Sequence, residues 1–131
     1  MTKEEVISTA AKWWSDKLAG KVRHDNGDNS RTSLMACLFA DMCAQPIQKE
    51  QLAIFEEELI KNIRRTYENH IEQVGCRYTV IGCDYGPCSE LYYAAEKAGI
   101  NHSNFPFKTW MHIGRDYVEV SDGYGRSYER I

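Results

Sequence analysis

The chain has 131 residues, of which 43% are hydrophobic and 27% are charged, and its net charge at pH 7 is −3. This composition predicts one globular domain, residues 1–131, with a core large enough to fold without a metal or a disulfide. The acidic balance argues against a dedicated nucleic-acid-binding protein, which usually carries a basic face. The longest apolar run, residues 33–44, is too short to span a bilayer, so we expect no membrane association.

The N-terminus and the cysteines predict a cytoplasmic protein. The first residues, MTKEEVIS, lack the basic start and the apolar core of a secretory signal peptide. Five cysteines at irregular spacing in a chain of this size are typical of reduced thiols rather than of a disulfide framework. We therefore expect no disulfide, and no motif indicates a cofactor.

Three helices are expected in the N-terminal half. Thr2 and Glu5 form a capping box that starts the first helix. The second helix begins near residue 29 or 30, and its body up to residue 44 is apolar almost all round, as in a helix surrounded by other elements. The third covers about residues 48–71, where apolar side chains recur at every fourth position.

The C-terminal half changes to short β-rich segments. Residues 77–84 form the first expected strand, and Pro87 is expected in the first turn of a fourth helix that ends at Gly99. Residues 109–113 and 117–121 form a hairpin of two further strands, and the tail that follows is expected to be irregular. The predicted fold class is α+β: a helical N-terminal half packed on a small mixed or antiparallel sheet of about three strands, with one further helix.

Several short segments carry a resemblance to a known group of proteins. They are CDYGP, EKAGI, FPFKTWM and VEVSDGYG in the C-terminal half, and HDNGDNSRTSLMACLFADM in the N-terminal half. In these segments the chain resembles small uncharacterised proteins encoded by gut Firmicutes and their phages. The resemblance implies a bacterial or phage setting and transfers no catalytic residue.

The first candidate binding site is the turn between the expected strand 77–84 and the next helix. Asp84, Tyr85, Gly86 and Cys88 lie at the carboxyl end of this strand, where α/β folds often contact ligands. The N–H groups of a helix N-terminus attract negative charge, so we expect a nucleotide-like or anionic ligand. Asp84 would accept hydrogen bonds from a ribose or an amine of that ligand. Ordinary turn chemistry, with Asp84 as a cap, is the alternative.

A polar loop, residues 24–29, is the second candidate and contains His24, Asp25 and Asp28. Two carboxylates and an imidazole can hold a cation or carry out acid–base chemistry. The loop lacks the glutamate of an EF-hand, because Ala36 stands at that position. Turn formation and helix capping explain the same residues, so we expect no metal site here.

Cys76, Cys83 and Cys88, with His70 nearby, raise the hypotheses of a zinc site and of a nucleophile. The spacing of these cysteines does not match the tight pairs of zinc sites, so we expect no zinc. Cys88 stands at a helix start, where the helix dipole lowers the pKa of a thiol and favours the reactive thiolate. Packing of Cys88 against the core is the alternative that we favour, because no histidine or asparagine partner can be assigned.

Aromatic and basic residues alternate near the C-terminus. Aromatics interleaved with cations can stack bases, but hairpin packing explains them as well, and the acidic chain makes nucleic acid an unexpected partner. The set comprises Lys108, Trp110, Arg115, Tyr117, Tyr124, Arg126 and Tyr128.

These observations favour a small cytoplasmic binding or interaction protein over an enzyme. The expected partner is a protein or a small anionic ligand, and a homo-oligomer stays an open alternative. The rival hypothesis is a small hydrolase or transferase that uses Asp25 and Asp28 together with the turn from Cys83 to Cys88. It requires the two loops to meet in one cleft.

Overall fold

The computed structural model of the chain describes residues 1–20, 47–123 and 127–131. The helices in these ranges are α1 (Lys3–Leu18), α3 (Lys49–Tyr67), η2 (Glu68–Val74, a π-helix), α4 (Ser89–Ala98) and η3 (His102–Asn104, a 3-10 turn). The strands are β1 (Tyr78–Asp84), β2 (Lys108–Gly114), β3 (Val118–Ser121) and β4 (Glu129–Arg130). The expected second helix, at about residues 29–44, lies outside the described residues.

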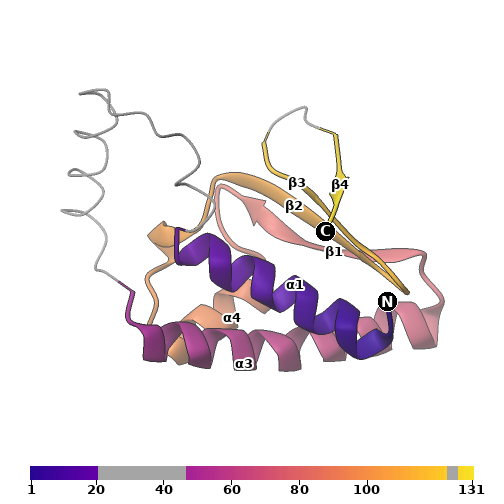
Figure 1. The fold of residues 1–131 in the computed structure, drawn as a ribbon, viewed down its shortest axis with the longest axis horizontal. Coiled ribbons are helices and arrows are strands. Elements are labelled where there is room, and N and C mark those ends of the chain that lie inside the picture. Colours follow the sequence, from indigo (N-terminus) through magenta and orange to yellow (C-terminus); the bar gives the residue numbers. More distant parts are fainter. Residues whose placement is uncertain (21–46, 124–126) are drawn as a thin grey trace.

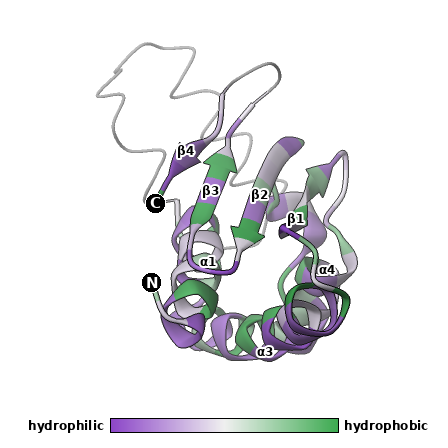
Figure 2. Ribbon diagram, turned by 90° about the vertical axis from the view of Figure 1, so that its right-hand side faces the viewer, coloured by the Kyte–Doolittle hydropathy of each residue, from purple (hydrophilic) through white to green (hydrophobic). Residues whose placement is uncertain are grey.

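The strands form one antiparallel sheet, and α1, α3 and α4 lie together on one of its faces (Figures 1 and 2). The strand order is β1-β2-β3-β4. α3 contacts both α1 and α4, while α1 lies against β2 and β3 and α4 lies against β1. The protein is therefore α+β, and no helix of the described residues covers the opposite face of the sheet (Figure 2).

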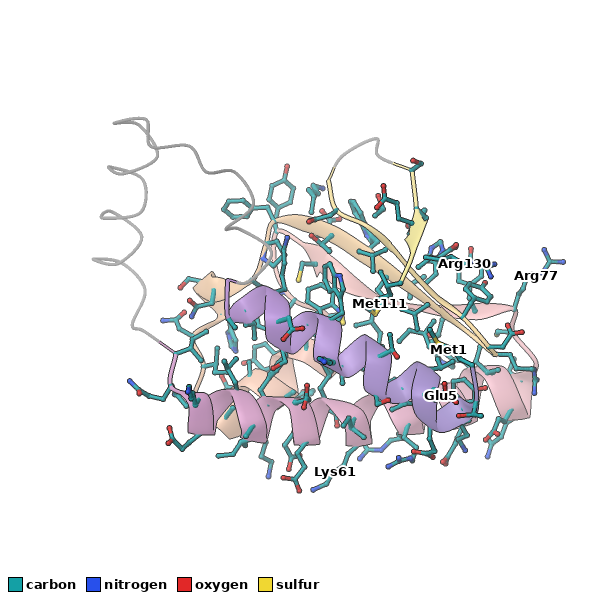
Figure 3. All side chains as sticks on the ribbon, in the orientation of Figure 1. Met1, Glu5, Lys61, Arg77, Met111 and Arg130 are labelled. Atoms are coloured by element: carbon teal, nitrogen blue, oxygen red, sulfur yellow. The ribbon has the colours of Figure 1, made fainter. Side chains whose placement is uncertain are left out.

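A continuous hydrophobic core fills the space between the helices and the sheet. Phe55, Leu59 and Ile63 of α3 are fully buried at four-residue spacing, which confirms the predicted apolar stripe. Met111 points from β2 into the same layer, whereas Lys61 points away from the sheet on the outer side of α3 (Figure 3). The helical period thus decides which side of α3 meets the sheet.

The ends of the helices follow the predicted capping residues. The backbone N–H of Glu5 donates to Thr2 Oγ at 3.2 Å, so Thr2 is the N-cap of α1. α3 continues directly into η2, which extends the expected long helix to Val74. Gly99 ends α4 with a φ of 71°, in the left-handed region that glycine adopts without strain.

The expected position of Pro87 in the fourth helix was wrong. α4 begins at Ser89 with Cys88 as its N-cap, and Pro87 precedes both. The backbone N–H of Cys88 donates to the carbonyl oxygen of Gly82 at 2.9 Å, and Pro87 forms a bridge to Cys83. The chain therefore folds back along the end of β1 before it turns into α4.

The expectation of an irregular tail was wrong for Glu129–Arg130, because these two residues form β4, which pairs with β3 and adds a fourth strand. Three stacked rings lie across the uncovered face of the sheet at this point. The ring centroids of Tyr78 and His112 are 4.2 Å apart, and those of His112 and Tyr128 are 4.0 Å apart. These contacts hold the tail against the sheet, although its sequence lacks the alternation that normally indicates a strand.

Gly82 is the position in β1 with the least room for a side chain. A Cβ atom there would lie 2.4 Å from the carbonyl oxygen of Thr109. We expect Gly82→Ala to lower the free energy of unfolding by about 1–3 kcal/mol, because the backbone of β2 must move. Gly86→Ala is the matched control, since nothing lies within 4 Å of its Cβ position. Denaturant titrations that gave the two variants equal stability would contradict this prediction.

Candidate functional site

The turn formed by residues 84–88 contains a strained tyrosine. Among the residues that the structure describes, Tyr85 is the only non-glycine residue with a positive φ, at 62°. This conformation costs a residue with a side chain about 1–2 kcal/mol. The backbone N–H of Tyr85 donates to the carbonyl oxygen of Phe107 at 2.8 Å, which ties the turn to the segment that enters β2. The side chain of Tyr85 lies in solvent, and 76% of the residue is exposed.

Phe107 places a second exposed ring beside Tyr85. The two ring centroids are 6.2 Å apart, and 72% of Phe107 is exposed. Burying such rings would be favourable, so a pair of them in solvent is typical of a binding surface. The turn and the start of β2 thus present one aromatic surface.

Lys108 supplies a positive charge next to the ring of Tyr85. Its ammonium group forms an ion pair with the carboxylate of Asp84. It also lies over the ring of Tyr85, 4.2 Å from the centroid, and 5.6 Å from the ring centroid of Trp110. The Lys108 side chain is 19% exposed, whereas that of Asp84 is 62% exposed. The cation is therefore enclosed by two aromatic rings, while its carboxylate partner faces solvent.

A shallow depression of about 250 Å³ adjoins this ion pair. Sites for drug-sized ligands usually have volumes of about 300–1,000 Å³, so this depression suits a single ring system or a small anion. The depression is lined by Val80, Gly82, Cys83, Asp84, Gly86, Cys88 and Trp110. The structure therefore brings Asp84, Gly86 and Cys88 of the predicted turn together with Trp110 of β2.

Cys88 is not the activated thiol that its place at a helix start predicts. Burial raises the pKa of the Cys88 thiol to about 11, and the N–H groups of Leu91 and Gly82 offset this effect only in part. Burial, followed by the proximity of Cys88, raises the pKa of the Cys83 thiol to about 12. Both thiols stay protonated at neutral pH, and Cys88 packs against the core. The desolvation of the thiol outweighs the helix dipole.

Zinc ligation by the cysteines of this region receives no support from the geometry. No three His, Cys, Asp or Glu side chains within residues 1–20, 47–123 and 127–131 are placed to hold a metal ion. His70 Nδ1 lies 2.9 Å from Thr79 Oγ, in a hydrogen bond that orients the ring.

The 24–29 loop, with His24, Asp25 and Asp28, lies outside the described residues. The hypothesis of a hydrolase or transferase that joins this loop to the turn from Cys83 to Cys88 therefore rests on the sequence alone.

Among the described members of the C-terminal aromatic and basic set, the cations lie apart from one another. Lys108 begins β2, whereas Arg115 follows its other end and donates to the carbonyl oxygen of Ile71 at 3.2 Å. The described cations of the hairpin are thus separated, and a nucleic-acid surface requires them to be clustered. Of the remaining residues, Trp110 lines the depression, Tyr117 lies beneath Arg130, Tyr128 stacks on His112, and Tyr124 and Arg126 lie outside the described residues.

Phe107 is the site residue that the sequence analysis did not single out. It belongs to the segment FPF, in which Phe105 is buried and Phe107 is exposed. The two phenylalanines occupy equivalent places in the local pattern, so no local signal distinguishes them.

Comparison with known proteins gives no family for this chain. No protein-family model matches it, and no curated protein is similar to it in sequence. In the described part of the chain, no helix is both long enough and apolar enough to cross a membrane. The inference of function therefore rests on the geometry of the 84–88 turn and its neighbours Phe107, Lys108 and Trp110.

Substitutions of Tyr85 test whether the left-handed turn is strained. Tyr85→Gly and Tyr85→Ala lose the same ring contacts, but only alanine keeps a Cβ atom in the strained conformation. We expect the glycine variant to be more stable than the alanine variant by about 1 kcal/mol. Urea unfolding of both variants provides the measurement. An alanine variant at least as stable as the glycine variant would show that residue 85 does not adopt a positive φ.

Site-resolved alkylation tests the raised thiol pKa values. We expect iodoacetamide at pH 8 to modify exposed Cys76 well before Cys83 and Cys88. Because the thiolate is the nucleophile, the rate at Cys88 should rise about tenfold per pH unit up to its pKa near 11. Mass spectrometry of the digested protein separates the five cysteines. Equal rates at Cys76 and Cys88 at pH 8 would refute the raised pKa.

Proposed function

We propose that the protein is a small cytoplasmic binding protein of bacterial or phage origin that binds a nucleotide-like ligand at the 84–88 turn. The observation that carries the proposal is the ammonium group of Lys108, held 4.2 Å from the centroid of the exposed Tyr85 ring beside an open depression. Binding is favoured over catalysis because the thiols of Cys83 in β1 and of Cys88 in the turn have raised pKa values and supply no nucleophile at neutral pH.

The rings of Tyr85 and Phe107 suit the planar part of such a ligand. Stacking of one base on an aromatic side chain contributes about 1–3 kcal/mol and depends little on the identity of the base. The volume of the depression, about 250 Å³, accommodates one ring system but not a whole nucleotide. The base would stack on the rings of Tyr85 and Phe107, which lie beside the residues that line the depression, and the rest of the ligand would extend over the sheet edge.

Lys108 and the start of α4 suit the anionic part of the ligand. The Lys108 ammonium lies over the ring of Tyr85, on which the base would stack, so a phosphate beside the base would reach it directly. Cys88, the N-cap of α4, also lines the depression, which brings the positive end of the helix dipole towards it. A single lysine and a helix N-terminus attract an anion without a basic surface.

A protein partner is the second candidate. The exposure of Tyr85 and Phe107, 76% and 72%, favours it, because tyrosine and other aromatics dominate the binding energy of protein interfaces. The depression and the enclosed ammonium group favour the small ligand, since a flat interface requires neither.

Calorimetric titration of the full chain with AMP and with adenosine tests the nucleotide hypothesis. We expect AMP to bind about three- to tenfold more tightly than adenosine, because only AMP offers a charge to Lys108. Lys108→Met should remove this difference and retain adenosine binding. Lys61→Met is the control, since Lys61 lies on the far side of α3 and its side chain is 55% exposed. If the wild-type protein binds neither compound, the nucleotide hypothesis is wrong and a protein partner becomes the better candidate.

A further inference from the structure

The Lys108 ammonium already has an anionic partner within the chain. Asp84 and Lys108 stand directly opposite each other in the antiparallel pairing of β1 with β2, so their side chains share the uncovered face. The backbone N–H of Asp84 donates to the carbonyl oxygen of Gly86 at 3.0 Å. This bond holds the backbone of the turn and does not involve the carboxylate of Asp84, which pairs with Lys108.

The two partners of the ion pair differ in how firmly they are held. The Lys108 side chain is 19% exposed and packs between the rings of Tyr85 and Trp110. The Asp84 side chain is 62% exposed. Rotation of Asp84 into water therefore costs little, whereas displacement of Lys108 would break two cation–ring contacts. An incoming anion would exchange with the carboxylate and leave the ammonium in place.

We infer that Asp84 is an internal competitor for the ligand anion, so that binding requires the ion pair between Asp84 and Lys108 to open. This inference rests on the proposed function and concerns the regulation of the same site. Asp84 lowers the affinity in two ways: its carboxylate occupies Lys108 in the free protein, and its charge repels an anion that lies nearby. From the sequence we expected Asp84 to accept hydrogen bonds from a ribose or an amine of the ligand. The role of internal competitor takes the place of that expectation.

Asp84→Asn, which keeps the shape of the side chain and removes its charge, tests the inference. We expect it to bind AMP about two- to fivefold more tightly than the wild type, the fold-change that corresponds to an exposed ion pair. Its affinity for adenosine should be unchanged, because adenosine carries no charge. Asp84→Ala should behave in the same way and excludes a residual hydrogen bond from Lys108 to asparagine.

Glu129→Gln is the matched control for net charge. Glu129 is exposed in β4, at the other edge of the sheet from β1, so this variant also removes one negative charge. We expect its AMP affinity to equal that of the wild type at physiological ionic strength, because screening suppresses effects between distant exposed charges. A thermal unfolding curve for each variant establishes that it is folded.

The outcomes separate the inference from the proposed function. Suppose that the wild type binds AMP and that Asp84→Asn binds it equally well or more weakly. That result would overturn the role of internal competitor and leave the proposed nucleotide site intact. If Asp84→Asn and Glu129→Gln gain the same affinity for AMP, the gain is an effect of net charge alone. That result would also overturn the inference. Failure of both the wild type and Asp84→Asn to bind AMP would refute the proposed function and the inference together.

Discussion

The register of β1 against β2 is the constraint on which the candidate site depends. Ile81 and Met111 are both fully buried and stand opposite each other in this pairing, so burial of apolar side chains fixes the register. The same register places Asp84 opposite Lys108 on the other face. A shift by one residue would turn one of these two side chains into the core, where a charge without its partner is strongly unfavourable. The stability of the sheet and the geometry of the site thus have one origin.

The arrangement of α1, α3 and α4 on a single face of the sheet leaves the candidate site on the opposite, uncovered face. Packing on one side uses the apolar side chains of each strand and leaves the alternate side chains on the uncovered face. Two of these side chains, Tyr78 and His112, stack on each other, and Tyr128, just before β4, stacks on His112. His112 Nδ1 also lies 3.0 Å from the carboxylate of Glu119. This end of the face is therefore occupied by internal contacts, whereas the end at the 84–88 turn keeps two exposed rings.

The environments of the side chains at the turn favour recognition rather than covalent chemistry. The thiols of Cys83 and Cys88 face the core, where desolvation raises their pKa values and suppresses the thiolate. The groups that face solvent are the carboxylate of Asp84 and the rings of Tyr85 and Phe107, beside the half-enclosed ammonium of Lys108, and such groups bind charges and planar groups without any covalent bond being made. The strained backbone at Tyr85 agrees with a role in binding, because strained backbone is typical of functional sites, where a side chain must take a particular direction.

The sequence by itself determined the local elements of this protein. The spacing of Phe55, Leu59 and Ile63 specified α3, the alternation around Val118 specified the hairpin, and the residues after β1 specified a turn with candidate binding groups. Tertiary structure alone decided that Asp84 meets Lys108, 24 residues further along the chain, and that the tail pairs with β3. Periodicity reports only which face of its own element a residue occupies. Which residues of different elements stand opposite each other depends on how the elements bury their apolar faces together, and that is a property of the whole fold.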